Sequence, residues 1–352
     1  MLFRSKSLIQ FGIAKRVTDV LESSGLSYVI FDGVQPNPTI DNINLGLSLY
    51  KENGCDFLVS IGGGSAHDCT KAIGILATNG GEVKDYRGAN VSKHKSPSIV
   101  AINTTAGTAA EITMACVITD SASKRKFAFR DKNALATLSV DDPELMTSLP
   151  KGLTAGTGMD ALTHAVESYV SRLAYTLTDE LALSAIKIVF TSLRTAVNDG
   201  ANMDGRDAMV YAQLMAGMSF GNASCGIVHA MSHQLSGQYD LPHGLCNAIL
   251  LPFCMEYNRK DPAVAAKYAN MARMVAPDRA AGLDDAAASA LAVKLVEELS
   301  ADIGTNKPLS ELGVKEEDFV LMATNSLEEG SMRNNPLHPS VEEVCEIYRA
   351  AL

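Results

Sequence analysis

The side chains best suited to chemistry are imidazoles and a carboxylate in two segments of the second half of the chain. Asp160 and His164 are four residues apart, as are His229 and His233, so on a helix each pair would share one face. His243 follows ten residues later and is expected to lie in a turn. This spacing could bring one carboxylate and several imidazoles to a common point.

A bound cation is the best explanation of this grouping. A single histidine among small apolar residues is more often a satisfied core residue, because burying an unpaired polar group is costly. Here four of the seven histidines of the chain lie in the two segments, together with an aspartate. One carboxylate with three imidazoles suits Fe²⁺ or Zn²⁺, whereas Mg²⁺ and Ca²⁺ prefer oxygen ligands.

A glycine-rich turn is the strongest signal in the first half. Residues 62–65 read Gly-Gly-Gly-Ser, between an apolar run expected to be a strand and a run with helical spacing. Backbone N–H groups in such a turn can approach a phosphate, and the dipole of the following helix favours its charge. The spacing is not that of the GxGxxG fingerprint, and a tight turn alone would explain it equally well.

A second loop, residues 103–108, reads Asn-Thr-Thr-Ala-Gly-Thr and also follows an apolar run. Its hydroxyls suit contacts to a diphosphate or a ribose, although a threonine-rich turn before a helix is the plainer alternative. Open α/β sheets bind ligands at the carboxyl ends of their strands. The two loops together therefore predict a nucleotide site.

These groups are positioned by two regions that differ in composition and in the periodicity of their apolar residues. In the first 150 residues, β-branched runs alternate with amphipathic runs, which predicts parallel strands covered by helices. The later sequence is rich in Ala, Leu, Met and Glu with helical spacing and almost no strand signal. We place the hinge at residues 150–152, between an α/β dinucleotide-binding domain (1–150) and an all-helical metal-binding domain (151–352). The expected strands are 28–32, 57–61, 99–103, 117–120, 127–130 and 138–141; the expected helices are 13–24, 40–53, 66–77, 176–191, 207–217, 262–274 and 284–301.

Composition excludes several classes of protein. The formal net charge of the 352 residues is −10 and no basic stripe stands out, which argues against nucleic-acid binding. No apolar run has the ~18 residues that a membrane span needs. The seven cysteines are scattered without a CxxC pair, so we expect neither a disulfide framework nor a zinc finger, and a cytoplasmic protein.

Taken together, these segments resemble the iron-containing (group III) alcohol dehydrogenase family, in the branch with 1,3-propanediol dehydrogenase, lactaldehyde reductase and the iron-type ethanol and methanol dehydrogenases. The resemblance covers nearly the whole chain. It is carried by residues 31–34, 36–38, 62–68, 103–108, 158–167, 222–224, 229–243 and 247–252.

The resemblance implies a dehydroquinate synthase-like fold, with an α/β nucleotide domain and an all-α metal domain. It implies a homodimer or larger homo-oligomer that interconverts a small primary alcohol and its aldehyde, using Fe²⁺ (alternatively Zn²⁺) and NAD. Asp160, His164, His229 and His243 would hold the metal, and His233 would lie beside it as a proton relay. The cofactor would be bound by Asn37, Gly63, Gly64, Ser65, Asp68, Thr104, Thr105, Thr108, Thr113, Lys126, Leu145 and Leu153.

The start of the chain departs from the family pattern. Relatives usually begin some 30 residues earlier, and their first nucleotide-domain strand ends in an Asp that binds the adenosine ribose. The matching positions here are Arg4 and Ser5. Either they accommodate a 2′-phosphate, which would favour NADP, or the start is truncated and the local match is accidental; we favour the second interpretation.

Two alternatives remain open at this point. A glycerol dehydrogenase-like or dehydroquinate synthase-like enzyme would share the fold, but the Thr104–Thr108 loop and the helix around Asp160 favour the alcohol dehydrogenase branch. A truncated, catalytically impaired homologue that persists as an oligomeric scaffold is the second alternative, and the intact metal residues argue against it.

Overall fold

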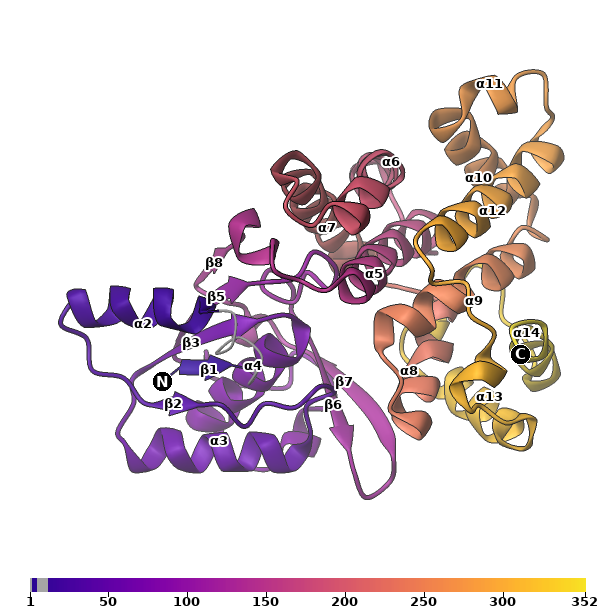
Figure 1. Cartoon of the computed structure of the whole chain (residues 1–352). Helices are drawn as coiled ribbons and strands as arrows, with labels where there is room; N and C mark the ends of the chain where they lie inside the picture. Colours follow the sequence, from indigo (N-terminus) through magenta and orange to yellow (C-terminus); the bar gives the residue numbers. More distant parts are fainter. Residues whose placement is uncertain (1, 5–11) are drawn as a thin grey trace. The chain divides into compact units, whose positions relative to one another are not determined.

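The computed structural model describes residues 2–4 and 12–352. The chain divides into two compact units, Met1–Ser148 and Leu149–Leu352, so the change of unit falls close to the hinge expected at residue 150. Each unit is described by itself below (Figure 1).

A parallel sheet of five strands forms the centre of the first unit. Its order is β2-β1-β3-β5-β8, and every pairing within it is parallel. The strands are β1 (Leu2–Arg4), β2 (Ile30–Phe31), β3 (Phe57–Gly62), β5 (Ser98–Asn103) and β8 (Leu138–Val140). Because Gly62 pairs with Asn103, the loops that follow β3 and β5 begin side by side at one edge of the sheet.

Helices α2 (Ile13–Ser23), α3 (Ile40–Glu52) and α4 (Gly64–Asn79) accompany this sheet. α4 is buried over residues 66–76. It packs against β3 and β5 of this sheet on one side and against the later strand β6 (Ala115–Asp120) as well. Leu58, Ile73 and Ile99 lie in this core and are almost fully excluded from solvent. Short 3-10 turns connect the elements at η1 (Val83–Tyr86), η2 (Lys132–Ala134) and η3 (Pro143–Met146).

The parallel arrangement expected for every strand of this region is wrong for two of them. β6 (Ala115–Asp120) and β7 (Arg125–Arg130) form an antiparallel hairpin, joined at its edge by the short β4 (Gly88–Ala89) in a separate three-stranded sheet. The hairpin packs on α4 through buried residues such as Cys116 and Phe129. A turn of only four residues, 121–124, joins its strands, which is too short for a parallel crossover.

The second unit is helical throughout, as expected. Between Leu149 and Leu352, all of which the structure describes, there is no strand. α5 (Lys151–Val170) is the central helix: it packs against α6, α7 and α9, and sixteen of its residues are buried. The other helices are α6 (Thr176–Asn198), α7 (Met203–Ala223), α8 (Ile227–Tyr239), α9 (His243–Asn258), α10 (Pro262–Val275), α11 (Pro277–Ala280), α12 (Asp285–Asp302), α13 (Phe319–Glu328) and α14 (Val341–Ala350), with 3-10 turns η4 (Leu309–Leu312), η5 (Glu316–Asp318) and η6 (Met332–Asn334).

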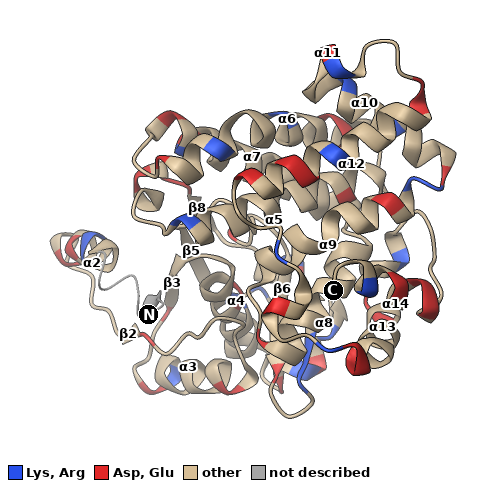
Figure 2. Ribbon diagram, turned by 45° about the vertical axis from the view of Figure 1, so that its right-hand side comes forward, with Lys and Arg blue, Asp and Glu red and all other residues tan. Residues whose placement is uncertain are grey.

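Charged residues of both signs are interspersed over both units, without a continuous basic stripe (Figure 2). Among the residues that the structure describes, no helix is both long and apolar enough to span a bilayer.

Candidate metal centre and cofactor loops

Three helices of the second unit bring a carboxylate and two imidazoles together. Asp160 lies on α5, His229 on α8, and His243 is the first residue of α9 rather than part of a turn, which corrects the expectation for that residue. Asp160 Oδ1 is 3.6 Å from His229 Nε2 and 3.5 Å from His243 Nε2. One donor atom from each of the three lies within 4.8 Å of the others, and Asp160 and His229 are buried.

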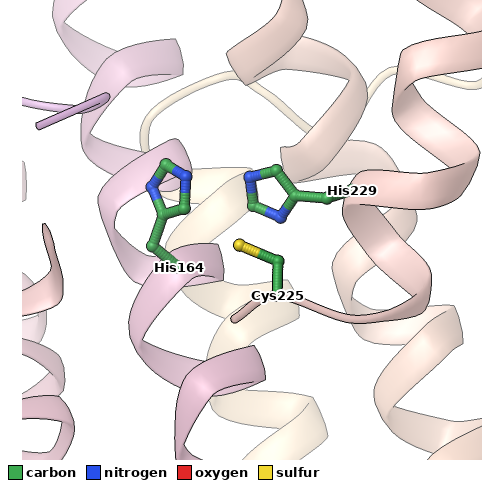
Figure 3. Close-up of side chains that lie close together, drawn as sticks. All are labelled: His164, Cys225 and His229. Carbon is green, nitrogen blue, oxygen red and sulfur yellow. The ribbon is translucent and has the colours of Figure 1, made fainter. Parts of the chain in front are cut away.

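His164, the fourth predicted ligand, lies one turn after Asp160 on α5. Its Nδ1 is 3.9 Å from Asp160 Oδ1, and its ring stacks on His229 at 4.4 Å between centroids and on Phe220 at 4.1 Å. The close donor group that contains His164 is a second one, with Cys225 and His229 (Figure 3). His229 therefore belongs to both groups.

His233 lies beside this cluster, one turn after His229 on α8. Its ring centroid is 5.2 Å from that of His243 and 6.2 Å from that of His229. Its Nδ1 is 3.5 Å from Glu329 Oε1, so the ring lies between a carboxylate and the predicted metal ligands.

A buried carboxylate that the sequence analysis did not assign, Glu167, orients His229. Glu167 Oε2 accepts from His229 Nδ1 at 2.5 Å, and Oε1 accepts from the backbone N–H of Val228 at 2.6 Å. Glu167 is only 3 % exposed. A carboxylate that accepts from Nδ1 orients the ring and, in the neutral imidazole, leaves the lone pair on Nε2, the nitrogen that faces Asp160.

The start of α8 depends on this contact, because Gly226 at its N-cap has no side chain to accept the first N–H groups. Asn335 Oδ1 accepts from the N–H of Ile227 at 3.2 Å, next to the Glu167 bonds. A Cβ at Gly226 would lie 2.7 Å from Asn335 Oδ1 and 3.2 Å from Glu167 Oε1. Glycine is therefore required here for the two side chains to reach the helix.

Asn247 holds the other side of the cluster. Its Nδ2 donates to Asp160 Oδ1 at 2.6 Å and lies 3.1 Å from His243 Nε2 and 3.4 Å from His229 Nε2. Asp160 Oδ1 and the two imidazole nitrogens thus all face the partially positive NH₂ group of Asn247. The position that these three donor atoms surround therefore favours positive charge.

A close crossing of two glycines places His243 against Asp160. A Cβ at Gly244 would lie 2.3 Å from the carbonyl oxygen of Gly156, which no side chain can tolerate. The start of α9 therefore touches the backbone of α5 directly, one turn before Asp160.

Electrostatics favour a charged carboxylate in this cluster. Burial alone would raise the pKa of Asp160, but His164, His243 and His229 outweigh it and hold the pKa well below its usual range. Burial likewise opposes charging of His229, while Cys225, Glu167 and Asp160 raise its pKa above the usual value. An anionic carboxylate with imidazole nitrogens is a donor set that fits Fe²⁺ or Zn²⁺.

In the first unit, the two predicted phosphate loops contact each other. The backbone N–H of Thr104 donates to Gly62 O at 3.0 Å, and Thr105 N–H donates to Asn103 Oδ1 at 3.1 Å. A Cβ at Gly63 would lie 2.6 Å from Thr105 Oγ1, and one at Gly64 would lie 3.0 Å from Thr108 Cγ2. Gly63 is the N-cap of α4, so the loops enclose the positive end of this helix.

The other residues predicted to bind the cofactor lie in varied surroundings. Lys126 Nζ donates to Asn37 Oδ1 at 2.7 Å. Asp68 is buried, and its Oδ2 accepts from the N–H of Val117 at 3.0 Å, so part of its role is to hold β6. Ser65 lies in the first turn of α4, Thr113 and Leu145 are buried in the first unit, and Leu153 is exposed in the first turn of α5. Ser5 lies outside the described residues, and only the backbone of Arg4 is described.

The three remaining histidines belong to neither donor group. His67 is buried in α4, where its Nδ1 is 2.8 Å from Ser60 Oγ, and burial lowers its pKa to about 3. His94 and His338 are exposed.

Comparison with known proteins decides the family. The sequence profile of the iron-containing alcohol dehydrogenases matches residues 1–143, and that of the C-terminal part of the same family matches residues 154–352. The chain belongs to the iron-containing alcohol dehydrogenase family. It is 45 % identical to the 1,3-propanediol dehydrogenase of Citrobacter freundii, over 97 % of this chain and 88 % of that protein. It is 41 % identical to the NAD-dependent methanol dehydrogenase of Bacillus methanolicus, over 97 % and 89 %.

The solved structures agree. A 1,3-propanediol oxidoreductase superposes with a TM-score of 0.96 at 44 % identity, covering 100 % of this chain and 91 % of that one. The predicted family, fold class and enzyme class are therefore confirmed, and this alcohol dehydrogenase interconverts alcohols and aldehydes. Iron and NAD(H) are the cofactors of the family. The glycerol dehydrogenase-like and impaired alternatives are not favoured.

Proposed function

We propose that this enzyme oxidises a small primary alcohol with NAD, or reduces the corresponding aldehyde, with Asp160, His164, His229 and His243 holding a divalent iron. The observation that carries the proposal is the convergence of one donor atom each from Asp160, His229 and His243 within 4.8 Å. His164 is the fourth ligand because it is one turn from Asp160 on α5 and its Nδ1 is 3.9 Å from the same Oδ1.

When bound, iron supplies Lewis-acid polarisation of the substrate oxygen. The chain supplies the orientation of the ligands and the path of the proton. Glu167 keeps the proton of His229 on Nδ1, and Asn247 fixes Asp160 by donating to its Oδ1. His233 takes the hydroxyl proton as a general base, and Glu329 stabilises the imidazolium that forms.

The dinucleotide is held by the loops of the first unit. The start of α4, at Gly63, Gly64 and Ser65, binds the diphosphate through backbone N–H groups and the helix dipole. Thr104, Thr105 and Thr108 supply hydroxyls from the neighbouring loop, which is in contact with Gly63 and Gly64. The remaining positions of this cofactor site are Asn37, Asp68, Thr113, Lys126, Leu145 and Leu153.

We also propose a cytoplasmic homodimer or larger homo-oligomer. None of the seven cysteines, which all lie in the described part of the chain, forms a disulfide, which fits a reducing compartment. Large apolar side chains are exposed on and before α6 and on α7, namely Leu173, Tyr175, Leu177, Tyr211 and Met218, and such a surface suits contact with a second copy.

A paired set of variants tests the proposal. In His243→Ala, anaerobically purified protein should lose iron and turnover together but still bind NADH, measured by the fluorescence of the nicotinamide. In Gly63→Ala the added Cβ displaces Thr105, so NADH binding should weaken while iron is retained. His94→Ala, at an exposed site, is the control and should change neither measurement.

The assay uses a panel of alcohols from methanol to 1,3-propanediol and glycerol, and the highest kcat/KM is expected for an unbranched primary alcohol. Full iron content and turnover in His243→Ala would refute the metal assignment. Unchanged NADH affinity in Gly63→Ala would refute the assignment of the cofactor loop.

A further inference from the structure

We propose that His164, Cys225 and His229 form a second binding position for a thiophilic divalent cation, Zn²⁺ or Cd²⁺, which shares His164 and His229 with the iron position and so excludes iron. The inference rests on the proposed function in one respect: His164 and His229 are taken to be iron ligands. Neither Asp160 nor His243 takes part in the second position.

The turn between α7 and α8 aims the thiol into the cluster. Cys225 follows Ser224, whose φ of 68° is in the left-handed region that residues other than glycine rarely adopt. The Cys225 side chain is buried, and its Sγ points into the space between the two imidazoles (Figure 3). One donor atom from each of His164, Cys225 and His229 lies within 4.8 Å of the other two.

The two shared residues make the positions mutually exclusive. Glu167 accepts from Nδ1 of His229, so this ring offers only Nε2 to a cation, and a nitrogen lone pair binds one cation at a time. An ion held by His164, Cys225 and His229 therefore removes two ligands from iron.

The thiolate distinguishes the two positions. The second position offers a thiolate with two imidazoles, which favours the soft ion Cd²⁺ and favours Zn²⁺ over Fe²⁺, whereas the first offers a carboxylate and accepts Fe²⁺ or Zn²⁺. Zinc or cadmium should therefore inhibit the enzyme by competing with iron rather than with the alcohol.

Cadmium titration of the metal-free protein tests this directly, because a Cd²⁺–thiolate bond gives a charge-transfer absorption in the ultraviolet that imidazole and carboxylate ligands do not. The wild type should develop this band with an equimolar amount of cadmium. Cys225→Ser should lose it and bind cadmium at least about tenfold more weakly, since even residues that only support a ligand change affinity by 10–100-fold. Cys225→Ala repeats the test with a side chain that cannot donate.

Two further variants separate the positions. Cys254→Ser is the matched control, because Cys254 is also buried in the same unit but belongs to neither donor group, and it should keep the band. His243→Ala should also keep the band although it loses iron. Prior loading of the wild type with Fe²⁺ should suppress the band.

A band of unchanged strength in Cys225→Ser, or loss of the band in His243→Ala, would overturn the second position. A band that persists beside bound iron would overturn the sharing of His164 and His229. Failure of the proposed function is seen separately, as iron retained by His243→Ala whatever the cadmium result.

Discussion

Replacing Glu167 should weaken iron binding although Glu167 is not itself a predicted ligand. Its two oxygens accept from His229 Nδ1 at 2.5 Å and from Val228 N–H at 2.6 Å, with a longer contact of 3.4 Å to His229 N–H. The glutamine of Glu167→Gln keeps the shape of the glutamate, but only one of its two terminal atoms can accept a hydrogen bond. One of the two donors, His229 Nδ1 or Val228 N–H, would therefore face the NH₂ group of the amide.

The expected loss of stability follows from the two short hydrogen bonds that Glu167 accepts. Hydrogen bonds to a charged group contribute roughly 1.5–3 kcal/mol each, so Glu167→Ala should lower the free energy of unfolding by about 3–6 kcal/mol and Glu167→Gln by about half of that. Loss of the partner that orients a metal-binding histidine typically lowers metal affinity by about 10–100-fold. We expect Glu167→Gln to lower the affinity for iron by a factor in this range.

The assay is anaerobic competition for Fe²⁺ against a chromophoric chelator, paired with urea unfolding of the metal-free protein. Asp131→Asn is the matched control: Asp131 is 1 % exposed and accepts from Ser92 N–H at 2.8 Å and Asn133 N–H at 3.0 Å, but it lies in the first unit. It should lose stability without losing iron affinity. Wild-type iron affinity in Glu167→Gln would refute the coupling between Glu167 and the metal centre.

Two further predictions concern the backbone contact of α9 and a buried histidine. Gly244→Ala should destabilise the protein by about 2–3 kcal/mol and release iron, because the new Cβ would lie 2.3 Å from Gly156 O. The control is Gly152→Ala, which has open space at its Cβ, and both variants are measured by urea unfolding. Equal stability of the two variants would contradict the argument. His67 has a folded pKa of about 3, below its unfolded value, so its contribution is complete above pH 6.5 and is lost as the pH falls toward 3. Between these limits the free energy of unfolding should fall by up to about 1.4 kcal/mol per pH unit more in the wild type than in His67→Asn, and parallel profiles in urea unfolding would show that His67 is not the cause.

Helices and strands could be predicted from the sequence where a periodic pattern continues over many residues or where a proline or glycine marks an end. α10 begins at Pro262 and β3 is followed directly by the glycines, so both were located to within a residue or two. The pairing of β6 with β7 was missed, because a short apolar run does not reveal the direction of its neighbour. β4 has only two residues, too few for any periodic pattern.

The same limit applies to the candidate site. Asp160 and His229 could be singled out because each stood in a turn-spaced pair of side chains that bind metals, and His243 because it follows the second pair closely. Glu167 and Asn335 were not assigned roles, because they act on residues 61 and 108 positions away in the sequence. A signal for Glu167 existed: it is one of two acids in α5 and lies three residues after His164, so the two share a face of the helix.

The cap on α8 also has a consequence for the order in which the metal site forms. The first N–H group of this helix is bound by Asn335, which follows it by 108 positions in the sequence. During synthesis, His229 and His243 leave the ribosome before Asn335, so the helix that carries His229 is incompletely anchored until Asn335 has emerged. Iron that meets the chain before that point would find a site whose α8 ligand is not yet held in place.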